Sequence, residues 1–302
     1  MTARPNVATE LALLLLLSAL WGASYTFIKL GVATIPPLTL IASRTLIAGL
    51  LLAAVIRVRG LAWPRDAATW RRFLLQACLN SVVPFTLIAW AEQAVDAGLA
   101  TILNSTSPIF AFLLTALVTR HEAATMSKLV GVAAGLLGVC LLVGVEALHG
   151  LGEALWAQLA IVAATICYAG AAIYGRGFKG LDPMLPAAGS LLAGTAVLLP
   201  AALVVDRPWT LAPSAASLQA LLALATISTA LALVIYFRLV QTLGSVGATA
   251  QSYLRVPIGV AIGVLALGER LSPTAWLGLG CVVAGVIAMT LPARKTVTAP
   301  AS

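Results

Sequence analysis

The sequence predicts an all-α integral membrane protein with ten transmembrane helices, built as two inverted five-helix repeats. Three observations support this fold class. The chain is 61% hydrophobic and 9% charged, with a mean hydropathy of +1.04, whereas about 25% of the residues of soluble domains are charged. Its 302 residues divide into apolar runs that are long enough to cross a bilayer. The second half of the chain also repeats residues of the first half at a nearly constant spacing.

The apolar runs set the expected helices, because a span needs roughly 20 residues at about 1.5 Å rise per residue. In the first half they cover 9–31, 37–57, 70–92, 96–119 and 126–146. In the second half they cover 153–176, 184–206, 214–241, 245–267 and 273–292. Breaks such as Pro36-Pro37 and Asp182-Pro183 separate them, as expected of residues that end helices. The first run continues past Trp21, so we interpret it as a span rather than a cleaved signal peptide.

The internal repeat divides the chain at about its middle. Matching residues are Gly98 and Gly247, Pro108 and Pro257, and Ile109 and Ile258 at a spacing of 149, then Glu122 and Glu269, Gly131 and Gly278, and Gly138 and Gly285 at 147. We therefore expect a first repeat over residues 1–147 and a second over 148–302. Because five spans per half is an odd number, the second half enters the membrane from the opposite side. Such inverted repeats meet near the bilayer midplane and favour transport by alternating access.

Basic residues are distributed unevenly between the two sides of the expected bundle. With the N-terminus inside, the cytoplasmic side holds twelve of them: Arg4, Arg57, Arg59, Arg65, Arg71, Arg72, Arg120, Lys128, Arg176, Lys179, Arg294 and Lys295. The other side holds Lys29, Arg207 and Arg270. This bias predicts that both termini face the cytoplasm of a bacterial inner membrane. The net charge of +8 is then a property of cytoplasmic loops, and we expect no nucleic-acid partner.

The motifs that carry most enzyme and metal chemistry do not occur in the sequence. The four cysteines lie in apolar runs without a CxxC motif or a histidine at ligand spacing, so we expect them to pack as small apolar residues. Neither GxSxG, HExxH nor a pair of mid-span aspartates occurs. We expect no metal, no cofactor and no enzymatic activity. The expected partners are a small-molecule substrate and the lipid bilayer, with the chain acting as a monomer or a homodimer.

Polar residues gather on one face of the fourth expected span. Thr101, Asn104, Ser105 and Pro108 follow one another at i, i+3, i+4 and i+7, which places them on one side of a helix. They either line a cavity or hydrogen-bond to a neighbouring helix. A proline inside a helix cannot donate a hydrogen bond to the carbonyl four residues earlier, so that carbonyl lacks its helical partner. Pro84, Pro108 and Pro257 are therefore expected to expose backbone carbonyls deep in the membrane.

Aromatic and basic residues occupy unusual depths. Trp21 and Tyr25 lie on one side of the first span, and Tyr168 is the repeat counterpart of Trp21. They could stack on a planar substrate or pack between helices. Two arginines also lie well inside spans, where a charge costs roughly 2.5–3.5 kcal/mol on insertion scales. We assign Arg255, close to Gln251 and Ser252, to substrate binding or gating, and Arg44 to a structural role.

These residues together resemble a known family. Leu20-Trp21-Gly22-Ala23-Ser24, then Lys29, Pro36-Pro37 and Arg44, is similar to the opening of the EamA-type exporters of the drug/metabolite transporter superfamily. Pro257 and Leu267-Gly268-Glu269-Arg270-Leu271 resemble the matching part of their second half. The resemblance implies ten helices, both termini inside, and export of small metabolites through a central cavity. Within the family, the chain most resembles exporters of aromatic and other neutral amino acids.

The candidate substrate-binding residues are Trp21, Tyr25, Asn80, Ser81, Thr101, Asn104, Ser105, Pro108, Tyr168, Ser228, Thr229, Gln251, Ser252, Tyr253 and Arg255. Export of purines, sugars or drug-like compounds is the alternative within transport. A membrane receptor or scaffold is the alternative outside transport, although neither role explains inverted repeats. A mid-membrane carboxylate would be needed for export of cations, and we find none.

Overall fold

The computed structural model describes residues 6–91, 94–95, 102–119, 125–143, 151, 153–258 and 273–290. Regular structure in these ranges is helical, and each of the ten predicted spans falls on a helix, which confirms the predicted fold class. The first half contains α1 (Val7–Val32), α2 (Pro37–Val58), α3 (Ala67–Ala77), α4 (Val83–Ala91), α6 (Ser107–Leu113) and α7 (Met126–Val143). The second half contains α8 (Leu155–Gly175), α9 (Met184–Val205), α10 (Ala215–Ala225), α11 (Ala232–Thr242), α12 (Gly244–Thr249), a helical segment over residues 251–258, and α14 (Pro273–Thr290).

Local sequence explains where several helices begin. The Asn6 side chain accepts a hydrogen bond from the Ala8 amide at 3.0 Å and caps α1. Asp66 accepts from the Thr69 amide at 2.7 Å and caps α3, and Ser214 caps α10 in the same way. α2 starts at Pro37, where the missing amide hydrogen is not needed. These polar caps lie between the apolar runs, where the helices begin.

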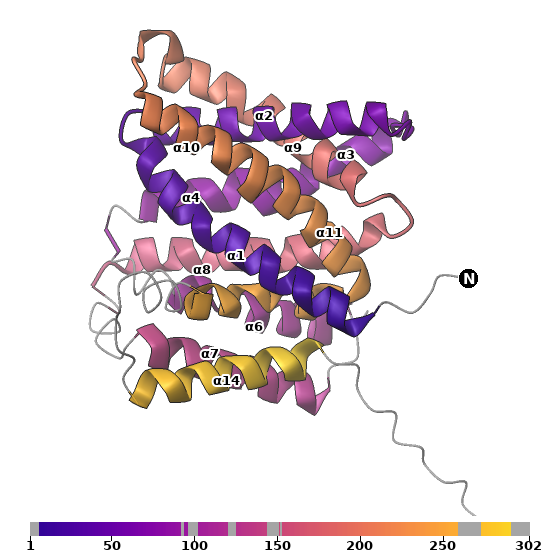
Figure 1. Ribbon diagram of the computed structural model, residues 1–302, viewed down its shortest axis with the longest axis vertical. Helices are drawn as coiled ribbons and strands as arrows, with labels where there is room; N and C mark the ends of the chain where they lie inside the picture. The colour runs from indigo at the N-terminus through magenta and orange to yellow at the C-terminus, as the bar shows by residue number, and fades with distance from the viewer. Residues whose placement is uncertain are drawn as a thin grey trace, which may run out of the picture.

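The packing of the helices is symmetric between the two halves of the chain. α2 packs against its counterpart α9, and α7 packs against its counterpart α14 (Figure 1). The contact of α4 with α8 is matched by the contact of α1 with α11, and that of α3 with α9 by that of α10 with α2. Exchanging the two halves therefore maps each of these helix contacts onto another one or onto itself, as expected of two related five-helix units.

α7 and α14 pack closely through the four glycines that recur between the repeats, each glycine meeting the partner of the other repeat pair. A Cβ on Gly131 would meet the Gly285 carbonyl oxygen at 2.8 Å, and a Cβ on Gly138 would meet the Gly278 carbonyl oxygen at 2.6 Å. The two backbones therefore touch, which a larger residue at either position would prevent. Figure 1 shows this pair at one end of the long axis of the molecule, with α2 and α9 at the other.

Three segments leave α-helical geometry and widen into π-helix. They are η1 (Cys78–Val82) between α3 and α4, η6 (Thr226–Leu231) between α10 and α11, and η2 (Leu114–Thr119) after α6. In η1 the chain widens just before Pro84, and the Val83 amide donates to the Cys78 carbonyl five residues back. η1 and η6 lie at corresponding points of the two repeats. Single π-turns inside α-helices often mark functional positions, and sequence reasoning predicted a proline kink rather than this geometry.

The fourth predicted span departs from one continuous helix. Residues 102–104 are helical, Ser105 and Thr106 form a turn, and α6 then starts with Pro108 in its first turn. Pro108 therefore begins a helix, where its missing amide hydrogen costs nothing, instead of bending one. The turn also rotates the residues that follow Asn104. The predicted common face of Asn104, Ser105 and Pro108 is consequently divided between two short helices.

Candidate functional site

A cavity of about 540 Å³ lies between the two halves of the chain. Its walls come from α1, α2, η1, α4, Val95, Asn104 and the start of α6 in the first half. In the second half they come from α8, the end of α10, η6, α11 and the residues Thr249, Gln251, Ser252 and Arg255. Along α1 it follows Trp21, Ser24, Ile28 and Val32, which lie on one side of that helix. The cavity therefore extends from the middle of α1 to the end of the helix bundle where α1 ends and α2 begins.

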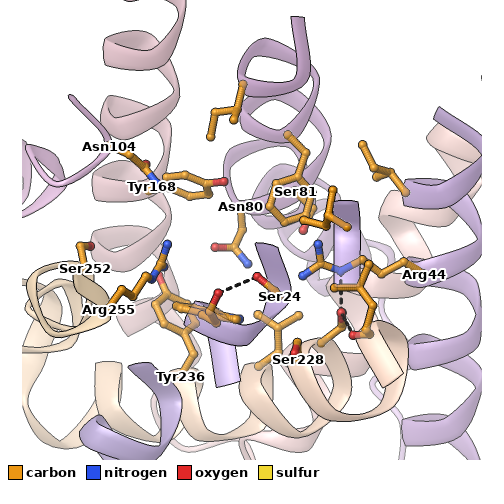
Figure 2. A pocket seen from close by; sticks show the side chains of 18 of the residues that line it. Ser24, Arg44, Asn80, Ser81, Asn104, Tyr168, Ser228, Tyr236, Ser252 and Arg255 are labelled. Atoms are coloured by element: carbon orange, nitrogen blue, oxygen red, sulfur yellow. Dashed lines mark hydrogen bonds between the residues drawn. The ribbon is translucent and has the colours of Figure 1, made fainter. Parts of the chain in front are cut away.

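Most of the predicted site residues meet in this cavity. The ten that line it are Trp21, Asn80, Ser81, Asn104, Tyr168, Ser228, Thr229, Gln251, Ser252 and Arg255. They lie on six separate stretches of the chain, and several converge on the same space in Figure 2. Their polarity is what made them detectable in the sequence, since polar groups inside spans generally face a cavity or a partner helix.

Of the other five predicted residues, two cannot be placed from the described part of the chain and three are absent from the described cavity lining. Thr101 lies outside the described residues, as does the side chain of Tyr25. Ser105 and Pro108 are buried but are not among the residues that line it. Tyr253 points away from it: its hydroxyl donates to the Val132 carbonyl on α7 at 3.1 Å, and the residue is fully buried.

One side of the cavity is built from stacked aromatic and cationic groups. The rings of Trp21 and Tyr236 pack with their centroids 5.5 Å apart. The guanidinium carbon of Arg255 lies 5.1 Å from the centroid of the Trp21 ring, and its Nε donates to Gln251 Oε1 at 2.8 Å. Such a cation–π contact compensates part of the cost of burying the charge. Tyr236 is buried on this side of the cavity.

Arg44, for which the sequence predicted a structural role, lines the opposite side of the cavity. The residue is 5% exposed, its Nε donates to Thr229 Oγ1 at 2.5 Å, and its guanidinium carbon lies 4.8 Å from the centre of the Phe85 ring. The signal that identified Arg255, an arginine deep in a span without an acidic partner, applied equally to Arg44. Among the described residues lining the cavity, none is an aspartate or a glutamate.

The two π-turns supply matched polar pairs to the cavity. Asn80 and Ser81 lie on η1, and Ser228 and Thr229 lie on η6, each 148 positions later (80 to 228 and 81 to 229). Because a π-turn packs an extra residue into the helix, the neighbouring side chains on the cavity side are rotated relative to a regular helix. The repeat thus places equivalent hydrogen-bonding groups on facing helices.

The cavity is closed toward the N-terminal end of α1. Leu14 and Leu17 are fully buried there, and the Ser18 hydroxyl donates to the Leu14 carbonyl at 2.7 Å and contacts the Gln251 carbonyl at 3.3 Å. Beyond them, Glu10 is 1% exposed, its Oε1 lying 2.8 Å from Arg238 Nη2 on α11.

Thr242 completes this contact by donating from its hydroxyl to the second carboxylate oxygen of Glu10 at 2.8 Å. We call Glu10, Arg238 and Thr242 the α1–α11 latch. Sequence reasoning missed it, because both charges lie near the ends of their spans, where charged residues are common. The equivalent contact of α4 with α8 is instead an apolar cluster of Ala91, Val95, Ala157, Ala160 and Ile161.

Comparison with known proteins identifies the class to which this fold and cavity belong. The model of the EamA-like transporter family matches the chain twice, over residues 9–144 and 155–291. An uncharacterized inner membrane transporter, YedA, of Escherichia coli K12 is 30% identical over 274 residues, covering 90% of this chain and 87% of the relative. A solved crystal structure superimposes with a TM-score of 0.80 at 17% identity, covering 96% of this chain and all of the other.

The chain belongs to the EamA-like transporter family, so it is a multi-pass membrane transporter of the inner-membrane type. The resemblance stated from its sequence motifs is thereby confirmed. A probable terminal-alkyne amino-acid exporter of Streptantibioticus cattleyicolor is 26% identical over 285 residues, covering 93% of this chain and 94% of the relative. An uncharacterized transporter of Bacillus subtilis, YoaV, is 21% identical and covers 90% of this chain and 93% of its own length.

Proposed function

We propose that the protein exports amino acids, with aromatic and other neutral amino acids as its preferred cargo, by alternating access through the central cavity. The observation that carries this proposal is the composition of the cavity wall. Arginines and aromatic rings share a space of about 540 Å³ with amide and hydroxyl groups, and no acidic residue lines it among the described residues. A carboxylate can pair with an arginine there, while a planar side chain can stack on Trp21 or Tyr168.

The size and polarity of the cavity agree with this cargo. Small-molecule sites generally have about 300–1,000 Å³ and a mostly apolar lining with a few convergent polar groups. The name of the relative in Streptantibioticus cattleyicolor, a probable amino-acid exporter, points to the same class. Purines, sugars and drug-like compounds remain the alternative cargo, because a purine would also stack on Trp21. Amino acids carry a carboxylate, whereas purines and sugars do not, so a requirement of binding for the carboxylate distinguishes these classes of cargo.

We further propose that the protein lies in a bacterial inner membrane with both termini in the cytoplasm, as its basic residues indicate. In this orientation the cavity extends toward the outer face, and the α1–α11 latch closes the cytoplasmic side. The substrate path then lies at the contact between residues 1–147 and 148–302. A monomer suffices for this path, since one chain supplies both halves of the cavity; a homodimer would not change it.

The test is flux in proteoliposomes that contain the purified full-length protein. The panel comprises radiolabelled neutral and aromatic amino acids, purines and sugars. We expect saturable flux of the amino acids, reduced in Trp21→Ala and in Asn104→Ala, both of which should still insert into the membrane. Saturable flux of purines or sugars alone would replace the proposed cargo. Absence of flux for every compound would favour a receptor or scaffold.

A further inference from the structure

Arg44 has binding capacity that its protein contacts leave unused. Its Nε is held by Thr229 and the face of its guanidinium rests on Phe85. Neither terminal nitrogen has a hydrogen-bond acceptor within the described part of the chain, although the residue is 95% buried (5% exposed) and lines the cavity. A buried guanidinium with unpaired donors is costly unless an anion or another acceptor joins it.

Ser228 provides a second unused group on the same side. It is fully buried on η6, next to the Thr229 that positions Arg44, and it lines the cavity. Its hydroxyl oxygen is buried without a hydrogen-bond partner among the described residues. Buried polar groups in folded proteins are nearly always paired, so an unpaired one calls for an explanation.

The positions of these groups separate them from the other cavity arginine. Figure 2 shows Arg44 and Ser228 on one side of the cavity and Arg255 on the other, with Asn80 between them. Arg255 already gives its Nε to Gln251 and stacks on Trp21. The side of Arg44 therefore offers two parallel guanidinium donors and a neighbouring hydroxyl, while the side of Arg255 offers an aromatic surface.

We infer that Arg44 and Ser228 form an anion-binding subsite that holds the carboxylate of the transported molecule. A planar guanidinium matches a carboxylate with two parallel hydrogen bonds, and the hydroxyl can donate a third. Thr229 and Phe85 are positioning residues, since they fix the guanidinium plane. Arg255 and Trp21 then form the surface against which the remainder of the substrate packs. This inference rests on the proposed amino-acid cargo, but it assigns the carboxylate to a specific site.

The test compares ligands that differ only in their charge at the carboxyl position. The probes are phenylalanine with phenylalaninamide, and benzoate with benzamide, the second pair lacking an α-amino group. Affinities are obtained from the concentration dependence of the thermal unfolding of the full-length protein in nanodiscs. We expect the wild-type protein to prefer each acid over its amide by about tenfold to a hundredfold, as for hydrogen bonds to charged groups.

The variants Arg44→Gln and Ser228→Ala should reduce this preference, and Arg255→Gln should keep it even if affinity falls for acid and amide alike. Ser228→Ala removes a hydroxyl that has no partner, so it should fold at least as stably as the wild type; this keeps the test decisive even if Arg44→Gln fails to fold. Ser190→Ala is the matched control: that buried hydroxyl donates to the Pro186 carbonyl at 2.7 Å and lies outside the cavity lining.

Two results would overturn the subsite. One is an acid preference that survives Arg44→Gln and Ser228→Ala and disappears in Arg255→Gln, which would place the carboxylate at Arg255. The other is a wild-type protein that binds acids and amides equally. Neither result is the same as failure of the proposed amino-acid cargo, which is measured as flux in proteoliposomes. If benzoate is preferred over benzamide through Arg44 but no amino acid is transported, the subsite is upheld and the cargo is rejected.

Discussion

The sequence around Tyr253 is compatible both with a place in the substrate path and with packing against a neighbouring helix. Its position among Gln251, Ser252 and Arg255 indicated a place in the substrate path. The described structure turns it toward α7, where its hydroxyl reaches the Val132 carbonyl and its ring lies against Gly135 so closely that a Cβ there would overlap it. Glycine at position 135 is therefore the partner of a buried tyrosine ring.

Replacing Tyr253 by phenylalanine should weaken the fold rather than transport. The change removes one buried hydrogen bond, worth about 1 kcal/mol, and leaves the ring in place. We expect a lower midpoint of thermal unfolding in detergent, with unchanged apparent affinity for an aromatic substrate. Gly135→Ala should cost more, because its new methyl group would meet the ring. If the Tyr253→Phe protein keeps its stability but loses substrate binding, Tyr253 contacts the substrate in the cavity after all.

Replacing Trp21 by alanine should lower transport without preventing membrane insertion. The indole packs on Tyr236 and beneath the Arg255 guanidinium, so its loss removes a stacking surface worth roughly threefold to tenfold in affinity. The measurement is the concentration dependence of flux in proteoliposomes. Trp209→Ala is the matched control, since Trp209 is 70% exposed and lies away from the cavity. Equal effects of the two substitutions would argue against stacking at Trp21.

At the scale of the helices, the α7–α14 pair allows a direct test of backbone contact. Gly138→Leu would force a side chain into the Gly278 carbonyl and the Val282 side chain, so we expect destabilisation of about 1–3 kcal/mol or more. Gly280→Leu on α14 is the control, because a Cβ there meets nothing within 4 Å. Thermal unfolding in the same detergent compares them. Similar midpoints for both variants would show that α7 and α14 are not packed through their glycines.

The apolar runs made most of these helices predictable from the sequence, and the repeat showed which helices of the two halves correspond. The π-turns were not predictable, because η6 contains no proline and its residues have no distinctive pattern. Of the ten predicted cavity residues, Trp21 and Tyr168 were found as aromatic residues inside spans and the others through their polarity. Arg44 was assigned to structure because sequence alone cannot show which way a buried arginine points.

At the scale of the whole molecule, the α1–α11 latch should govern access to the cavity from the N-terminal side of α1. Glu10→Gln removes the charge that holds Arg238, whose side chain is 48% exposed and can be solvated by water. In a variant without the four native cysteines, Ser24→Cys should then react faster with a membrane-impermeant thiol reagent added on that side. We expect a change of roughly tenfold, corresponding to about 1.4 kcal/mol of lost latch energy.

Glu153→Gln serves as the control for this experiment, because Glu153 is exposed and lies outside the cavity lining. In the Glu153→Gln variant, the introduced cysteine of Ser24→Cys should react with the thiol reagent at the same rate as in the parent protein. If Glu10→Gln also leaves the reactivity unchanged, the ion pair plays no part in closing that end.

Under the proposed alternating access, the difference between the latch and the apolar α4–α8 contact would make the two halves of the transport cycle respond differently to salt. An ion pair near the protein surface weakens as ionic strength rises, because the Debye length falls from about 10 Å at 0.1 M to about 3 Å at 1 M. An apolar contact does not weaken in this way, and salts such as sulfate strengthen it. Salt should therefore accelerate opening at one membrane face and slow it at the other. Although the two repeats share one architecture, the inward and outward half-cycles of the proposed alternating access would then respond to salt in opposite directions.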